Sequence, residues 1–155
     1  MQIYKWRGWI MLEVTVDKFI FRFPETLLFS DEGTWLAVDG KRARVGLSDF
    51  SQQLNGDIAF AKVEPVGTEI KAGDEFGSID TVKVNLSLPS PVSGRIVEVN
   101  PLLGDSPEVI NQDPYGKGWM VIIDLLDWEK DRLVLLDAPH YLARVKEQAE
   151  AELKK

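Results

Sequence analysis

The residues that could do chemistry gather in one stretch near the middle of the chain. There, Lys83 stands within Asp80-Thr81-Val82-Lys83-Val84. The strand-like arms on either side end in Gly73, ten residues before the lysine, and Gly94, eleven residues after it. This symmetry predicts a hairpin that holds the lysine amine at its tip, where an enzyme could acylate it and let the product swing. Taken alone, the pattern also fits a solvated lysine on an exposed turn.

Other kinds of reactive site find little support. The chain has no cysteine, which excludes disulfides, thiolate metal sites and a cysteine nucleophile. Its single histidine, His140, argues against a histidine metal cluster or a catalytic triad. The glycines around Lys117 lead into a strand, so they do not form a phosphate-binding loop. Asp74, Glu75 and Asp80 fit solvated turn residues better than an acid/base pair. We therefore predict no catalytic residue and no metal site.

The composition points to one acidic domain of 155 residues, of which 45% are hydrophobic. Eighteen basic residues against 25 acidic ones give a net charge of −7, which disfavours a nucleic-acid partner. The first residues carry two cations, but Glu13 and Asp17 interrupt the apolar run that follows. We expect neither a signal peptide nor a membrane span, and we expect a cytoplasmic protein.

The elements that must position Lys83 are mostly short strands. Residues 9–16 and 19–23 predict a hairpin turning at Asp17-Lys18, and Asp39-Gly40 predicts a second hairpin. Further expected elements are a helix after Ser48, strands at 58–63, 95–100 and 119–123, a helix at 106–111 capped by Ser106, and a helical tail from about Asp124 with a helix start at Asp137-Ala138-Pro139. Short strands broken by Gly and Pro turns, with helices at the edges, predict a mainly β fold, a flattened barrel or sandwich.

Two segments are expected along the chain. Residues 1–23 form an N-terminal extension with an extra hairpin, and residues 24–155 form the domain that carries Lys83 and the C-terminal helix. A compact domain without catalytic machinery, built around a displayed lysine, indicates a carrier or a binding module.

Three sequence runs carry a resemblance to a known family. They are GDEFGSIDTVKV around Lys83, PSPVSGRIVEVNPLL, and SPEVINQDPYGKGWM. Over roughly residues 24–145 the chain resembles the H protein of the glycine cleavage system, a lipoyl carrier. The resemblance implies a barrel-sandwich hybrid of the lipoyl-domain type with a C-terminal helix, and the DPYGKGW run is its most specific part.

Carried over residue by residue, the resemblance implies that Lys83 is the lipoyl attachment site. Asp80 and Thr81 stand where the family has glutamate and serine, and they are implied to help a lipoate ligase or lipoyl transferase recognise the hairpin. The motif reads Asp-Thr-Val-Lys-Val where the family has Glu-Ser-Val-Lys-Ala, and Gly33-Thr34-Trp35 replaces an early His-Glu-Trp. About twenty additional residues precede the matching region.

The resemblance also implies partners. A lipoyl arm would receive an aminomethyl group from a pyridoxal-phosphate glycine decarboxylase, deliver it to a tetrahydrofolate-dependent aminomethyltransferase, and be reoxidised by a dihydrolipoyl dehydrogenase. One alternative is an H-like lipoate-binding protein of a heterodisulfide-reductase-like sulfur-oxidation pathway, which the altered motif and the missing histidine favour. Another is an unmodified binding or structural module. A biotin carrier fits less well, because Val82 and Val84 replace the methionines that usually flank a biotinyl lysine.

Overall fold

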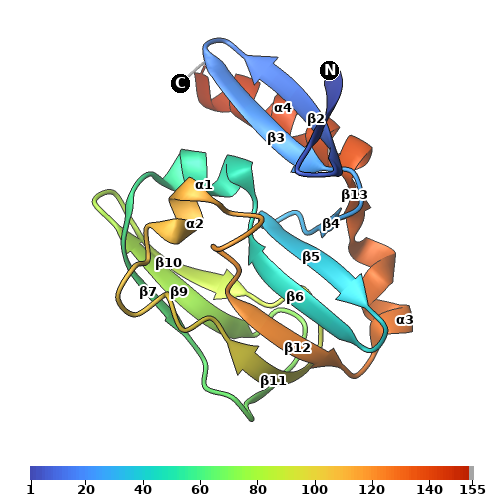
Figure 1. Cartoon of the computed structure of the whole chain (residues 1–155), viewed down its shortest axis with the longest axis vertical. Coiled ribbons are helices and arrows are strands. Elements are labelled where there is room, and N and C mark those ends of the chain that lie inside the picture. The colour runs from blue at the N-terminus through green and yellow to red at the C-terminus, as the bar shows by residue number, and fades with distance from the viewer. Residues whose placement is uncertain (154–155) are drawn as a thin grey trace.

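The computed structural model describes residues 1–153 and forms a mainly β protein with helices at its edges (Figure 1). This confirms the fold class expected from the sequence. The strands are β1 (Gln2–Trp6), β2 (Trp9–Val16), β3 (Phe19–Pro24), β4 (Leu28–Phe29), β5 (Thr34–Asp39), β6 (Arg42–Leu47), β7 (Ile58–Val63), β8 (Glu69–Ile70), β9 (Glu75–Thr81), β10 (Asn85–Pro89), β11 (Gly94–Val99), β12 (Val121–Leu125) and β13 (Leu136–Asp137). The helices are α1 (Asp49–Asn55), α2 (Val109–Gln112), α3 (Trp128–Asp131), the 3-10 turn η1 (Arg132–Val134) and α4 (Ala138–Leu153).

The strands of residues 1–153 form three sheets. A seven-stranded sheet has the order β13-β4-β5-β6-β12-β11-β8, and a three-stranded sheet has the order β10-β9-β7. Buried apolar side chains from both, such as Val45, Ile79 and Ile96, share one core, so the two sheets pack face to face. The third sheet, β1-β2-β3, comes from the first 24 residues.

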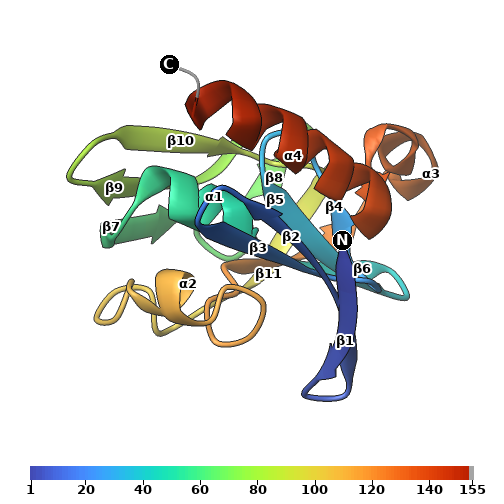
Figure 2. The same ribbon diagram turned by 90° about the horizontal axis from the view of Figure 1, so that it is seen from above.

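The N-terminal sheet packs against the rest of the chain through a second core. Phe23 of β3 meets Tyr141 of α4 edge to face at 5.3 Å, and Tyr141 stacks on Phe29 of β4 at 4.5 Å. All three rings are almost completely buried. Figure 2 shows α4 running alongside β2 and β3, with its C-terminal end on the same side as the β9–β10 turn. The first strands and the last helix therefore stabilise each other, although they are far apart in the sequence.

Several local predictions are confirmed. Strands β2 and β3 pair through the turn at Asp17, whose φ of 55° is left-handed, and β5 and β6 pair around Asp39-Gly40. The Ser48 side chain caps α1 by accepting a hydrogen bond from the Ser51 N–H. Helix α4 begins as expected, with Asp137 accepting from the His140 N–H at 3.0 Å. That bond, more than the contact with the imidazole, lowers the pKa of the Asp137 carboxyl.

Two boundaries and one strand differ from expectation. The helix expected at 106–111 begins only at Val109, because the backbone before it forms turns closed by i→i+3 hydrogen bonds. Ser106 was expected to cap this helix with its side chain. It accepts the Val109 N–H through its backbone carbonyl instead. The tail does not turn helical at Asp124, because β12 runs on to Leu125 between β6 and β11. Strand β1 was not expected, and it pairs with β2 along its whole length. The division at residues 23 and 24 remains a prediction, and residues 154 and 155 of the second segment lie outside the described residues.

Candidate functional site

The turn that carries Lys83 is closed by the side chain of Thr81. The Thr81 N–H donates to the Val84 carbonyl at 2.8 Å, which closes the β9–β10 hairpin. The Thr81 hydroxyl oxygen accepts from the Lys83 N–H at 3.2 Å and from the Val84 N–H at 3.1 Å. A threonine hydroxyl that accepts from N–H groups two and three residues on is a common way to fix a tight turn. Thr81 thus sets the backbone conformation of the lysine.

Lys83 itself is exposed at the tip of this hairpin. Among residues 1–153, no side chain forms a hydrogen bond or ion pair with its ammonium group. The neighbouring Val82 is almost fully exposed, so an approaching enzyme meets little steric hindrance from the preceding residue. An exposed amine at a turn, with no partner among the described side chains, is accessible to an acylating enzyme.

Asp80 lies on the last part of β9, opposite Asn85 of β10. Its side chain is half-buried, and none of the described residues forms a hydrogen bond or ion pair with its carboxylate. The structure therefore brings Asp80, Thr81 and Lys83 together at one turn, with one carboxylate and one amine open to a partner.

Sequence reasoning missed what lies beside the lysine. Lys83 lines a groove of about 230 Å³ together with Phe19 and Phe21 of β3, Phe50 and Leu54 of α1, and side chains of α4. Nothing in the local sequence of residues 19–21 indicates this position, because Phe19 and Lys83 are 64 residues apart. The N-terminal extension thus reaches the candidate site.

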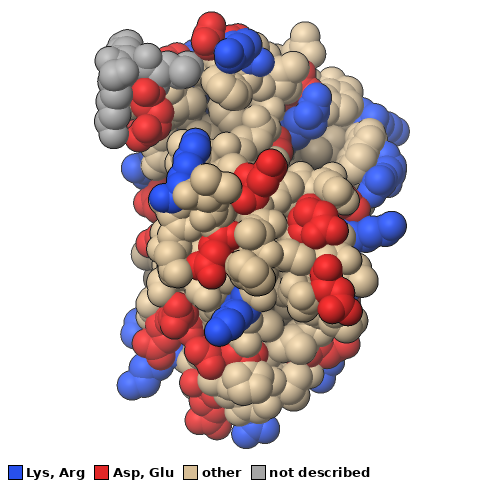
Figure 3. Space-filling view, turned by 90° about the vertical axis from the view of Figure 1, so that its left-hand side faces the viewer, with Lys and Arg blue, Asp and Glu red and all other residues tan. Residues whose placement is uncertain are grey.

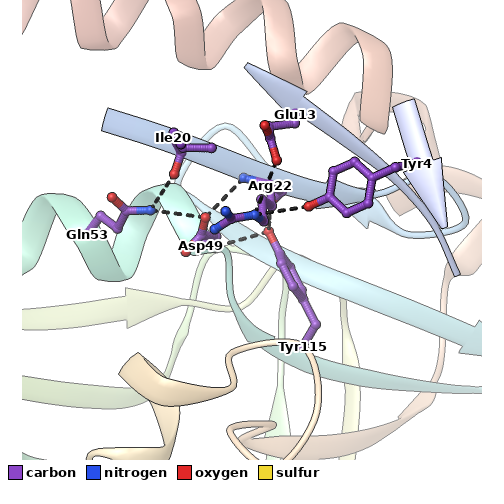
Figure 4. Close-up of polar contacts among 7 residues, drawn as sticks. All are labelled: Tyr4, Glu13, Ile20, Arg22, Asp49, Gln53 and Tyr115. Atoms are coloured by element: carbon purple, nitrogen blue, oxygen red, sulfur yellow. Dashed lines mark hydrogen bonds and ion pairs between the residues drawn. The ribbon is translucent and has the colours of Figure 1, made fainter. Parts of the chain in front are cut away.

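The extension is fixed in this position by a polar cluster (Figure 4). The Tyr115 hydroxyl donates to the Arg22 carbonyl at 2.6 Å and accepts from the Asp49 N–H at 3.0 Å. The Asp49 carboxylate accepts from the Arg22 N–H at 3.0 Å and from the side-chain amides of Gln52 and Gln53. Burial, with the Asp49 charge as a smaller contribution, raises the pKa of Tyr115 well above its ordinary value, so its hydroxyl keeps its proton.

Replacing Tyr115 by phenylalanine tests this junction. The Tyr115→Phe variant leaves a buried N–H and a carbonyl without their partner, so we expect the free energy of unfolding to fall by about 2 kcal/mol. Urea unfolding followed by tryptophan fluorescence measures the change. Tyr4→Phe is the control, because Tyr4 bonds the partly exposed Arg22 side chain and not a buried backbone group. Equal losses in both variants would contradict the role of Tyr115.

The other motifs that carry the family resemblance make contacts that hold the fold together. The Trp35 indole N–H donates to the Pro114 carbonyl at 2.9 Å, and the buried Asn100 amide donates to the carbonyls of Lys117 and Trp119. At Gly118, a Cβ atom would lie 2.6 Å from the Val109 carbonyl oxygen, so the loop can close only with glycine there. The DPYGKGW run therefore holds loops together.

Comparison with known proteins decides the family. The sequence profile described as Glycine cleavage H-protein matches residues 27–148. The chain belongs to the glycine cleavage H-protein family. It is 46% identical over 125 residues to the glycine cleavage system H protein of Geobacillus thermodenitrificans, covering 80% of this chain and 97% of that protein. It is 42% identical over 127 residues to the H protein of Carboxydothermus hydrogenoformans, covering 82% and 97%.

A solved structure agrees with this family assignment. The crystal structure of a glycine cleavage system H protein from Mycobacterium marinum matches with a TM-score of 0.69 and 28% sequence identity, covering 79% of this chain and 98% of that one. The lipoyl-domain type of fold with a C-terminal helix is thereby confirmed for this H-protein family member. The match to named H proteins does not favour the sulfur-oxidation alternative. Within the described part of the chain, no helix is both long and apolar enough to cross a bilayer.

Proposed function

We propose that this chain is a lipoyl carrier of the glycine cleavage system and that lipoate is attached through an amide bond to Nζ of Lys83. The observation that supports this most directly is the exposed Lys83 ammonium, which has no partner among residues 1–153 and sits at a turn fixed by Thr81. These residues fit the group, because acylation needs an accessible amine and leaves the hairpin hydrogen bonds intact.

The chain's own part in the reaction is to display and to position. Bound lipoate supplies a disulfide that can accept an aminomethyl group and a pair of electrons. Lys83 tethers the group, which replaces free diffusion with a high effective concentration at each enzyme that binds the carrier. The Thr81 turn holds the tether point at an exposed position, and the absence of cysteine means that no thiol of this chain can exchange with the disulfide.

The proposal extends to partners and location. We take the partners to be glycine decarboxylase, aminomethyltransferase and dihydrolipoyl dehydrogenase, with a lipoate ligase or lipoyl transferase acting first, all in the cytoplasm. The chain acts as a non-catalytic component. Family membership and the names of the relatives support this set.

The deciding experiment is an intact-mass measurement after coexpression with a lipoate ligase and free lipoate. We expect a gain of one lipoyl group, located at Lys83 by peptide sequencing, and no gain in a Lys83→Arg variant. The loaded protein should then support glycine–bicarbonate exchange by glycine decarboxylase. A folded chain that gains no mass, beside a working positive control, would favour the unmodified module.

Asp80 provides a second test. We expect Asp80→Ala to slow lipoylation about tenfold while leaving the thermal midpoint nearly unchanged, because a half-buried carboxylate without a partner contributes little to stability. The rate of mass gain with purified ligase measures the effect. Asp39→Ala is a suitable control, because Asp39 is an exposed acid at the β5–β6 turn, in the other large sheet. Lipoylation at the wild-type rate in Asp80→Ala would remove Asp80 from ligase recognition.

A further inference from the structure

Several exposed apolar side chains lie near the candidate attachment lysine. Val82 is 99% exposed, Phe60 68%, Leu54 44% and Phe19 38%. They come from four different parts of the chain, namely the hairpin turn, β7, α1 and β3. We call these four residues the apolar collar. Large apolar side chains that remain in water close to a reactive amine call for a physical reason.

One side of the collar is the groove next to Lys83. Its floor consists of Phe21 and Phe50, which are buried and meet edge to face at 5.1 Å, and Phe19 stacks beside Phe21 at 6.3 Å. Leu54 lines the same groove from α1. A preformed apolar recess with rigid aromatic walls suits a single inserted side chain, which is the usual form of an anchor at a protein interface.

The other side of the collar lies across the hairpin. Phe60 pairs with Asp80 in the β7–β9 register, and an irregularity between Ile58 and Phe60 shifts the strand there. The next pair, Ala61 and Ile79, packs into the core, so Phe60 points to the outer face of the sheet. An arm folding back from Lys83 into the groove would leave Phe60 and Val82 in water. A surface that covers all four residues must belong to a larger partner.

We propose that the apolar collar is the docking surface for the enzymes that act on Lys83 and its arm, and that β3 of the N-terminal extension forms part of it. This rests on the proposed function. An enzyme whose catalytic groups reach Nζ of Lys83 must bring its surface close to these residues, because Val82 precedes Lys83, Phe60 pairs with Asp80, and Leu54 and Phe19 line the same groove as Lys83. The fitting partner face has apolar side chains around the mouth of its active-site tunnel, one of which enters the groove. Figure 3 shows this side of the molecule, where uncharged surface runs between scattered charged side chains.

The test compares Phe19→Asp and Phe60→Asp with a matched control, Leu133→Asp. Leu133 is 79% exposed but lies in η1, outside the collar. Two enzymes serve as probes: a lipoate ligase acting on the unmodified protein, and glycine decarboxylase acting on the lipoylated protein in glycine–bicarbonate exchange. We expect each collar variant to raise the KM for the carrier about tenfold with kcat nearly unchanged. The control should behave as wild type, and all variants should keep the wild-type thermal midpoint.

The outcomes separate the two proposals. If wild type gains its lipoyl group and the collar variants keep the KM of the control, the collar is wrong and the carrier function stands. If a wild-type KM is accompanied by faster alkylation of the reduced arm in Phe19→Asp, the groove shelters the arm and the docking proposal is overturned. If wild type gains no lipoyl group, the proposed function fails, and the collar fails with it. Should Phe19→Asp misfold, Phe60→Asp on β7 decides the question.

Discussion

We expect the Lys83→Arg variant to lose carrier activity completely while keeping the fold. Arginine preserves the positive charge and the length of the side chain, but it lacks the primary amine that an acylating enzyme requires. Because no described residue pairs with the Lys83 ammonium, its replacement breaks no side-chain interaction within residues 1–153. The thermal midpoint should therefore stay within about 1 °C of wild type, corresponding to a few tenths of a kcal/mol.

Glycine–bicarbonate exchange with glycine decarboxylase and a thermal melt together measure the Lys83→Arg result. Lys71→Arg is the control, because Lys71 is also exposed on a turn, away from the hairpin tip. It should leave both the exchange rate and the midpoint unchanged. Residual activity in Lys83→Arg would place the attachment point elsewhere, and a large drop in the midpoint would give Lys83 a structural role.

The second large effect is expected from Gly94→Ala. Gly94 is buried at the start of β11, between β12 and β8, where it pairs with Leu125 and Ile70. A Cβ atom there would collide with the Asp124 carbonyl oxygen and would lie 2.7 Å from Cγ2 of Ile123. Backbone atoms of a central strand cannot move aside without breaking the β11–β12 pairing. We expect a loss of about 4 kcal/mol in the free energy of unfolding, a large part of the stability of a domain of this size.

Urea unfolding measures the effect of Gly94→Ala, with soluble yield as the readout if the variant does not fold. Gly104→Ala is the matched control, since no atom lies within 4 Å of a Cβ built there. The control should change the free energy of unfolding by less than about 1 kcal/mol. A similarly small change in Gly94→Ala would mean that β11 and β12 do not approach as closely as the structure has them.

The family could be recognised from the sequence because its signatures are local. The DPYGKGW run folds into a loop whose turns are fixed by Asp113 and by the glycines within it, for instance through bonds from the Gly116 and Gly118 N–H groups to the Asp113 carbonyl. The Lys83 hairpin is equally local, since its turn is closed by bonds between Thr81, Lys83 and Val84. Such short-range bonds depend on a few neighbouring residues, which is why a pattern can predict them.

Helix and strand limits were less predictable. The sequence pattern predicts that the last long strand ends near Ile123. In the structure β12 continues to Leu125, because β11 provides pairing partners for Asp124 and Leu125. A strand extends as long as its neighbours can satisfy its hydrogen bonds, and those neighbours come from distant parts of the sequence. Strand β1 is a similar case, since its short polar and aromatic sequence becomes a strand only by pairing with β2.

The sequence by itself determined the mainly β class, the displayed Lys83 with Asp80 and Thr81 beside it, and the resemblance to H proteins. Only the tertiary structure decided that Phe19 of the extension stands next to Lys83 and that β3 shares a core with α4. The physical reason is the range of the interactions. A turn is specified by the conformational preferences and hydrogen bonds of four or five consecutive residues, whereas the position of the extension depends on the fit of buried rings such as Phe23 and Tyr141, which lie more than a hundred residues apart.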